Sequence, residues 1–171
     1  RFGMKRKNIF GLTGLLLLLL STSVFATIYY DDGGHHVINS TLGDSIFIDK
    51  SSPSRGTAVE VAEAGKIGDV YAYEDSAFIL NGGETYNIKL YDNSEAFING
   101  THGRLALWGN SEMHIYNSEM CSSISIYNAS KVILYGYDFA LNGQAIKDGV
   151  YLLSDLLPSP YNNTVNGYFE T

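Results

Sequence analysis

Two acids and two histidines that could bind a metal lie close together near the start of the sequence: Asp31, Asp32, His35 and His36. Carboxylate oxygens and neutral imidazole nitrogens are ligands for zinc and similar metals. Adjacent side chains of a strand point to opposite faces, so the two histidines converge only if the backbone turns at the glycines before them. We interpret the cluster as a solvated turn, with a metal site as the alternative, and assign no metal ligand.

Acidic side chains in polar turns could hold calcium between repeats. They are Glu74, Asp75 and Asp92. The Gly-Gly-x-Gly-x-Asp calcium-binding repeat does not occur in the sequence. Because Asp and Asn side chains favour tight turns by bonding to the nearby backbone, turn chemistry explains these residues without an ion.

Glu95 and Glu112 occupy equivalent repeat positions and could form a glycosidase pair if neighbouring repeats stack. Polysaccharide lyases and hydrolases also need clustered acids, or a basic side chain beside them, in one groove. The basic residues of this region are instead expected on different columns: Lys89, Arg104 and Lys131. We therefore predict a non-enzymatic protein with no catalytic residue and no cofactor. A small carbohydrate-active enzyme, of the lyase or hydrolase type, is an alternative.

An evenly spaced aromatic set is the best candidate for a binding surface: Tyr73, Tyr91, Trp108 and Tyr127. Flat rings along one axis can stack on sugar rings, and Tyr and Trp suit surfaces that are half exposed to water. The alternative is that the rings pack on one another and cover a corner of the fold. Extracellular polysaccharide or a surface protein is the expected partner, and the oligomeric state is left open.

These aromatic residues mark a four-fold internal repeat. The segments 70–83, 88–100, 105–117 and 124–136 align on them with spacings of 18, 17 and 19 residues. A weaker copy precedes them, formed by 45–49, a polar loop at 50–55 and 58–62. Each copy also carries an aligned serine, at Ser76, Ser94, Ser111 and Ser130.

Each repeat predicts two short strands, because apolar and polar residues alternate with a period of two. The first strand turns one set of apolar residues to a common face: Val70, Ala72, Ile88, Leu90, Leu105, Leu107, Ile124 and Ile126. The second strand does the same with Phe78, Leu80, Ala96, Ile98, Met113, Ile115, Val132 and Leu134. We expect these residues to form the core.

Two strands in about 18 residues fit an antiparallel β-meander or sandwich, or a parallel β-solenoid in which each repeat is one coil. Like residues at equivalent positions favour the solenoid, because they would stack from coil to coil. We predict an all-β, single-stranded-type parallel β-solenoid of about five coils over residues 45–137, with an N-terminal cap at 27–44 and a C-terminal cap or tail at 138–171. Aromatic and Ser/Asn columns are expected along the outside or the corners.

Residues 1–26 have the pattern of a Sec signal peptide, with translation starting at Met4. A basic segment precedes an apolar run from Ile9 to Leu20, and small residues stand before the expected cleavage point after Ala26. The run is short for a membrane span of about 20 residues, so an uncleaved anchor is the alternative. We predict export to the extracellular space or cell surface, with the periplasm as another destination, and no stable membrane span afterwards.

Composition narrows the remaining classes of function. The chain of 171 residues allows one domain, and its single cysteine, Cys121, excludes a disulfide scaffold or a Cys-based zinc finger. We expect Cys121 to be a small buried side chain, with an intermolecular disulfide or a reactive thiol as the alternatives. Removing the signal peptide removes four basic residues, so the formal net charge changes from −7 to −11. This acidity argues against nucleic-acid binding.

The repeats resemble short-repeat exported bacterial β-solenoid proteins, many of which carry a C-terminal PEP-CTERM sorting signal. The similar features are the Tyr-Glu-Asp-Ser and Tyr-Asp-Asn-Ser turns at 73–76 and 91–94, the Asp-Asp-Gly-Gly-His-His opening at 31–36, and the end of the array at 135–139. The resemblance implies an exported surface or matrix protein. The Pro-Glu-Pro motif, second apolar span and basic tail of that signal do not occur here, so its sorting route does not carry over.

Overall fold

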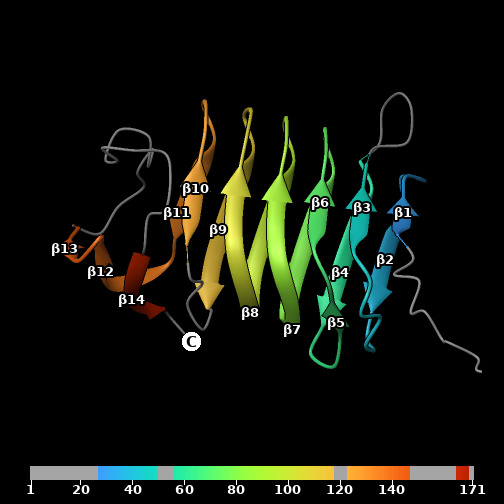
Figure 1. Ribbon diagram of the computed structural model, residues 1–171, viewed down its shortest axis with the longest axis horizontal. Coiled ribbons are helices and arrows are strands. Elements are labelled where there is room, and N and C mark those ends of the chain that lie inside the picture. Colours follow the sequence, from blue (N-terminus) through green and yellow to red (C-terminus); the bar gives the residue numbers. More distant parts are fainter. Residues whose placement is uncertain (1–26, 50–55, 118–122, 147–164, 170–171) are drawn as a thin grey trace, which may run out of the picture.

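The computed structural model describes residues 27–49, 56–117, 123–146 and 165–169. Within them the chain is all-β and winds into a parallel β-solenoid of about five turns (Figure 1). The predicted signal peptide, the loop 50–55, Cys121 and much of the predicted C-terminal tail lie outside the described residues.

Each turn of the solenoid has two main sides, which we name face A and face B. Face A consists of β1 (Ile28–Tyr30), β3 (Ile46–Ile48), β6 (Val70–Ala72), the second halves of β7 (Ala77–Leu90) and β8 (Glu95–Leu107), and β10 (Ile124–Ile126). Face B consists of β2 (His35–Ile38), β4 (Ala58–Ala62), the first halves of β7 and β8, β9 (Glu112–Asn117) and β11 (Lys131–Leu134). A short strand, β5 (Lys66–Ile67), lies at the bend that β7 and β8 pass through without a break.

All strand pairs of this sheet are parallel, and the predicted inward positions of successive repeats pair with one another. Val70 pairs with Ile88, which pairs with Leu105, which pairs with Ile124. The solenoid prediction is therefore confirmed, and the antiparallel alternative is wrong for this part of the chain. Parallel pairing follows from the sequence because it places like residues of successive repeats directly beside one another.

The core runs along the axis between the two faces. The residues predicted to point inward are all buried, except Leu134, which is partly buried and packs against the others. Ile38, Ile46, Ile48, Val59, Val61 and Ile67 extend the same core into the earlier turns. Successive turns thus bury a continuous apolar column.

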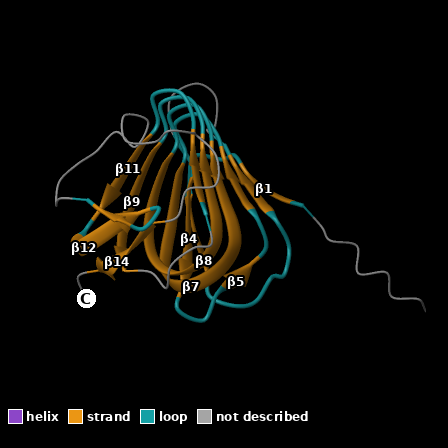
Figure 2. Cartoon of the chain, turned by 60° about the vertical axis from the view of Figure 1, so that its left-hand side comes forward, coloured by secondary structure: helices purple, strands orange, loops and turns teal. Residues whose placement is uncertain are grey.

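The corner that leads from face A to face B uses a left-handed residue in each turn. Glu74, Asp92, Gly109 and Asn128 have φ between 53° and 76°. Figure 2 shows these turns gathered along one edge of the solenoid. At Gly109 a Cβ atom would lie 2.8 Å from the Cα of Asp92 on the previous turn, so this position has no room for a side chain.

The serine column lies at this corner, one of the two places expected for it, and its side chains point to the inside. Ser76, Ser94, Ser111 and Ser130 are at most 1% exposed, and Thr57 continues the column. Their burial is tolerated because the hydroxyls are bonded: Ser94 Oγ donates to the Tyr91 carbonyl at 2.8 Å, and Ser130 Oγ donates to the Tyr127 carbonyl at 2.8 Å. Serine, although polar, therefore forms the edge of the buried core in each repeat.

The two ends of the array differ. In the segment predicted as the N-terminal cap, β1 pairs with β3 and β2 with β4, both in parallel. At the other end, β12 (Gly136–Leu141) pairs antiparallel with β13 (Gln144–Ala145) and β14 (Val165–Phe169). Among the residues that the structure describes, no helix has the length and apolar character needed to cross a membrane.

Candidate functional site

The predicted aromatic column forms one continuous stack. Tyr73 and Tyr91 have ring centroids 4.8 Å apart, Tyr91 and Trp108 4.7 Å, and Trp108 and Tyr127 5.0 Å. The ring planes of these pairs lie within 7° of parallel. We name this set the aromatic ladder.

The ladder uses the faces of its rings for internal packing. Each inner ring is covered on both faces, and all four side chains are half-buried. Burial raises the pKa of the Tyr73 and Tyr91 hydroxyls above the usual value. The geometry fits the packing interpretation, because a sugar ring would have to displace a neighbouring ring to stack on an inner one.

More aromatic rings extend along face A toward the N-terminal turn. Phe47 stacks on Tyr71 with centroids 4.5 Å apart and on Tyr29 at 5.0 Å. They belong to the neighbouring outward column, in which Tyr29, Phe47 and Tyr71 pair in register two residues before the column of Tyr73. This second column was not predicted as aromatic, because its later members are Lys89 and Ala106.

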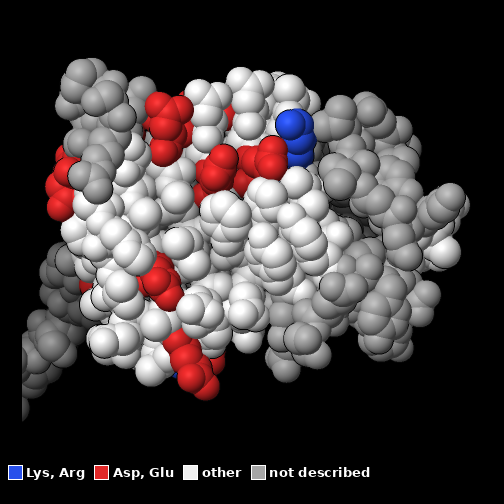
Figure 3. Space-filling view, turned by 180° about the vertical axis from the view of Figure 1, so that it is seen from behind, with Lys and Arg blue, Asp and Glu red and all other residues white. Residues whose placement is uncertain are grey.

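On face B one member of the predicted acidic pair, Glu112, belongs to an ion-pair group. Glu95 and Glu112 lie in register on adjacent turns. The Glu112 carboxylate is 3.0 Å from Nε2 of His114 and 3.5 Å from Nζ of Lys131. Glu95, Glu112 and Lys131 thus form one column on successive turns, and Figure 3, which views the molecule from behind, shows mostly acidic charge on that side.

The two histidines of the N-terminal cluster have different partners and do not converge on one site. Nε2 of His36 lies 2.8 Å from Oδ1 of Asp32, which also accepts a hydrogen bond from the Gly34 N–H at 2.8 Å. These hydrogen bonds, first that to His36, lower the pKa of the Asp32 carboxyl. His35 instead pairs with Glu60 at 3.5 Å. Across the described ranges no group of three or more His, Cys, Asp or Glu side chains could hold a metal.

The polar corner residues bond to their counterparts on neighbouring turns. Asn93 donates to Asp75 at 3.3 Å, and Asn110 donates to Asn93 at 3.3 Å. This amide ladder lies where the corner acids had suggested calcium as an alternative. The turn interpretation accounts for the contacts.

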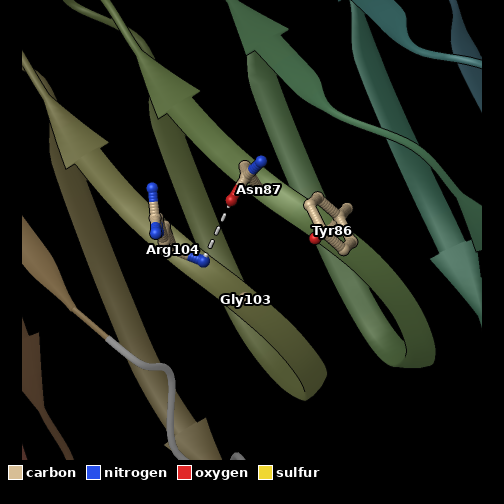
Figure 4. Close-up of a pocket in the computed structure, with 4 residues that line it drawn as sticks. All are labelled: Tyr86, Asn87, Gly103 and Arg104. Atoms are coloured by element: carbon tan, nitrogen blue, oxygen red, sulfur yellow. Dashed lines mark hydrogen bonds between the residues drawn. The ribbon is translucent and has the colours of Figure 1, made fainter.

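A hollow on face A brings together residues that the sequence analysis had left apart. Its first part, about 360 Å³, is lined by Tyr86, Asn87, Gly103 and Arg104 (Figure 4). Its second part, about 260 Å³, also touches Asn87 and Arg104 and extends over Lys89, Ala106 and two serines of the next turn, Ser123 and Ser125. We name the two parts together the face A hollow.

The hollow forms where the outward side chains become smaller from one turn to the next. Tyr71 pairs with Lys89, and Lys89 with Ala106, so the outward side chain shrinks from turn to turn. At Gly103 a Cβ atom would overlap the Tyr86 carbonyl oxygen, so this position cannot carry a side chain. The Asn87 side chain accepts a hydrogen bond from the Arg104 backbone N–H at 3.2 Å and fixes one wall (Figure 4).

Lys89 and Arg104 lie on different columns, as predicted, but those columns are adjacent and both side chains line the hollow. Lys89 is held in place, because its Nζ donates to Asp69 at 3.1 Å and to the Tyr71 hydroxyl at 2.9 Å. Burial alone would lower the pKa of Lys89, but these bonds give a net increase. The two side chains therefore place two positive charges at one surface.

No family model matches the chain, and no curated protein or solved structure matches it either. Its function is therefore argued from the geometry of the aromatic ladder, the face B ion pairs and the face A hollow.

Proposed function

We propose that the protein is an exported, non-enzymatic β-solenoid that acts in adhesion at the cell surface or in the extracellular matrix. The observation that carries the proposal is the aromatic ladder. Four rings that cover one another along the axis stiffen a surface and leave little ring face for a substrate. This arrangement suits a structural element.

The face B acids support the non-enzymatic part of the proposal. A glycosidase needs one carboxyl group free to donate a proton and a second free to attack or to activate water. The Glu112 carboxylate is engaged by both His114 and Lys131, so it is not free for either role. A carbohydrate-active enzyme is therefore not the function we propose.

Export is tested by following the protein in fractionated cells. The wild-type chain should appear outside the cytoplasm with Thr27 as its first residue, which mass spectrometry of the N-terminal peptide can establish. A Leu17→Arg variant, which places a charge within the apolar run, should remain inside with residues 1–26 attached. Leu17→Ile is the matched control and should be processed like wild type. Wild-type protein found in the cytoplasm with an intact N-terminus would refute the proposal.

A further inference from the structure

Arg104 differs from the other basic side chains that the structure describes. Lys66 is 2.6 Å from Glu84, Lys89 is 3.1 Å from Asp69, and Lys131 is 3.5 Å from Glu112. Within the described residues, the Arg104 guanidinium has neither an ion-pair nor a hydrogen-bond partner. An unpaired guanidinium on a strongly acidic chain leaves its donor fork available to an anion from outside.

The surroundings of Arg104 are shaped for a flat, hydroxylated molecule. Tyr86 is 74% exposed and forms no stack with another described ring, unlike the residues of the aromatic ladder. Its ring lies on β7, one residue before Asn87, which pairs with Arg104 on β8 and stands between the two side chains in Figure 4. An exposed aromatic face beside polar groups can take the apolar face of a sugar ring. Ser123 and Ser125 add hydroxyl groups at the far side of the hollow.

We propose that the face A hollow binds a uronate-bearing acidic polysaccharide, with a sugar carboxylate on Arg104 and a sugar ring against Tyr86. A carboxylate matches the two parallel N–H donors of a guanidinium. Lys89 also lines the hollow, but its ammonium is paired with Asp69, so among the described basic residues Arg104 is the one that offers an unpaired charge to the polymer. The inference rests on the proposed surface or matrix role and names the class of ligand for it.

An acidic peptide is less suited to this surface. Peptides gain affinity by adding a strand to a free sheet edge or by placing apolar anchors in a pocket. Here β8 is already paired on both sides, with β7 and with β9 and β10, so it offers no free edge. The hollow is lined mainly by polar, charged and small side chains.

Calorimetric titration of the purified protein with polygalacturonate at low salt tests the inference. We expect saturable binding that falls about tenfold or more in Arg104→Ala, because a charged hydrogen-bonded contact is lost. Arg104→Lys should recover only part of the affinity, since an ammonium lacks the planar fork. Tyr86→Ala should also weaken binding. Lys131→Ala removes one positive charge on face B and is the matched control, with unchanged affinity.

Three further ligands give the other outcomes. The fully methyl-esterified polymer, which has no charge, should not bind. Equal binding of dextran sulfate with no effect of Arg104→Ala would show simple ion exchange and overturn the inference. Poly-L-glutamate that binds as tightly, with the same dependence on Arg104, would show a peptide site and also overturn it. If polygalacturonate does not bind while fractionation still places the protein outside the cell, the inference fails and the proposed function stands.

Discussion

Thr85 and His102 are paired in register on neighbouring turns, and both side chains are buried, but they differ in how their polar atoms are bonded. Thr85 Oγ1 donates to the Gly68 carbonyl at 2.8 Å. His102 has Nδ1 at 3.2 Å from the Gly103 carbonyl, while its Nε2 has no partner among the described residues. Protonating Nε2 would therefore create a buried charge without a partner.

Stability should fall as the pH drops below about 6.5, the ordinary pKa of histidine. Burial lowers the pKa of His102 in the folded protein, so the unfolded chain takes up the proton first and acid favours unfolding. Between pH 7.5 and 5.5 this group can remove up to about 1.4 kcal/mol. Chemical denaturation at the two pH values measures the loss.

The variant for this measurement is His102→Thr, which copies the residue of the previous turn. Its unfolding free energy should change less between the two pH values than that of wild type. If the wild-type and variant differences are equal, His102 is not the group responsible.

Replacing Leu90 by Asp should cost several kcal/mol and abolish cooperative unfolding. Leu90 is fully buried in the centre of the core, and a carboxylate there would have no partner. Circular dichroism during heating is the measurement. Glu95→Ala, at an exposed position of face B, should stay within about 0.5 kcal/mol of wild type. A wild-type melt for Leu90→Asp would contradict the assigned core.

The aromatic ladder should show measurable coupling between Tyr91 and Trp108. A double-mutant cycle with Tyr91→Ala and Trp108→Ala should give an interaction free energy of about 0.5–1.5 kcal/mol, since the rings stack at 4.7 Å. The Trp108→Ala variant should keep its affinity for polygalacturonate, because the ladder is separate from the face A hollow. A strong loss of binding in that variant would instead assign sugar recognition to the ladder.

Gly109 should be intolerant of substitution. Gly109→Ala would force a Cβ atom to within 2.8 Å of the Asp92 backbone and would also strain a left-handed residue, so we expect a loss of about 1–3 kcal/mol. Asn128→Gly, at the equivalent corner of the next turn, is the comparison and should change stability little. Equal unfolding midpoints for Gly109→Ala and wild type would show that the corner relaxes freely.

The fold could be predicted because its signals are local and repeated. Alternation within each strand identifies the inward residues, and the spacing of Tyr73, Tyr91, Trp108 and Tyr127 fixes which residues stack. The burial of Ser94 could not be predicted from this alternation, because a polar residue is assigned to the solvent side. Its bond to the carbonyl of Tyr91 appears only once the corner is folded.

The face A hollow could not be predicted because it depends on space between columns. Gly103 and Ala106 line it with no side chain and a single methyl group, and a search for chemical groups does not select such residues. His102 was missed for another reason. It lies between the aligned segments 88–100 and 105–117, where no strand was predicted, and the alternation of β8 breaks between His102 and Leu105.

Within the described residues, the strands of each turn pair with those of the turn before it and the turn after it, as the pairing of β7 with β6 and β8 shows. A pulling force applied at the two ends would run along these bonds, which lie in series, so turns would open one at a time. Each released repeat of about 18 residues would lengthen the molecule by roughly 60 Å. Between a cell and a polymer that it holds, such an array would extend in steps under tension and keep its remaining turns folded.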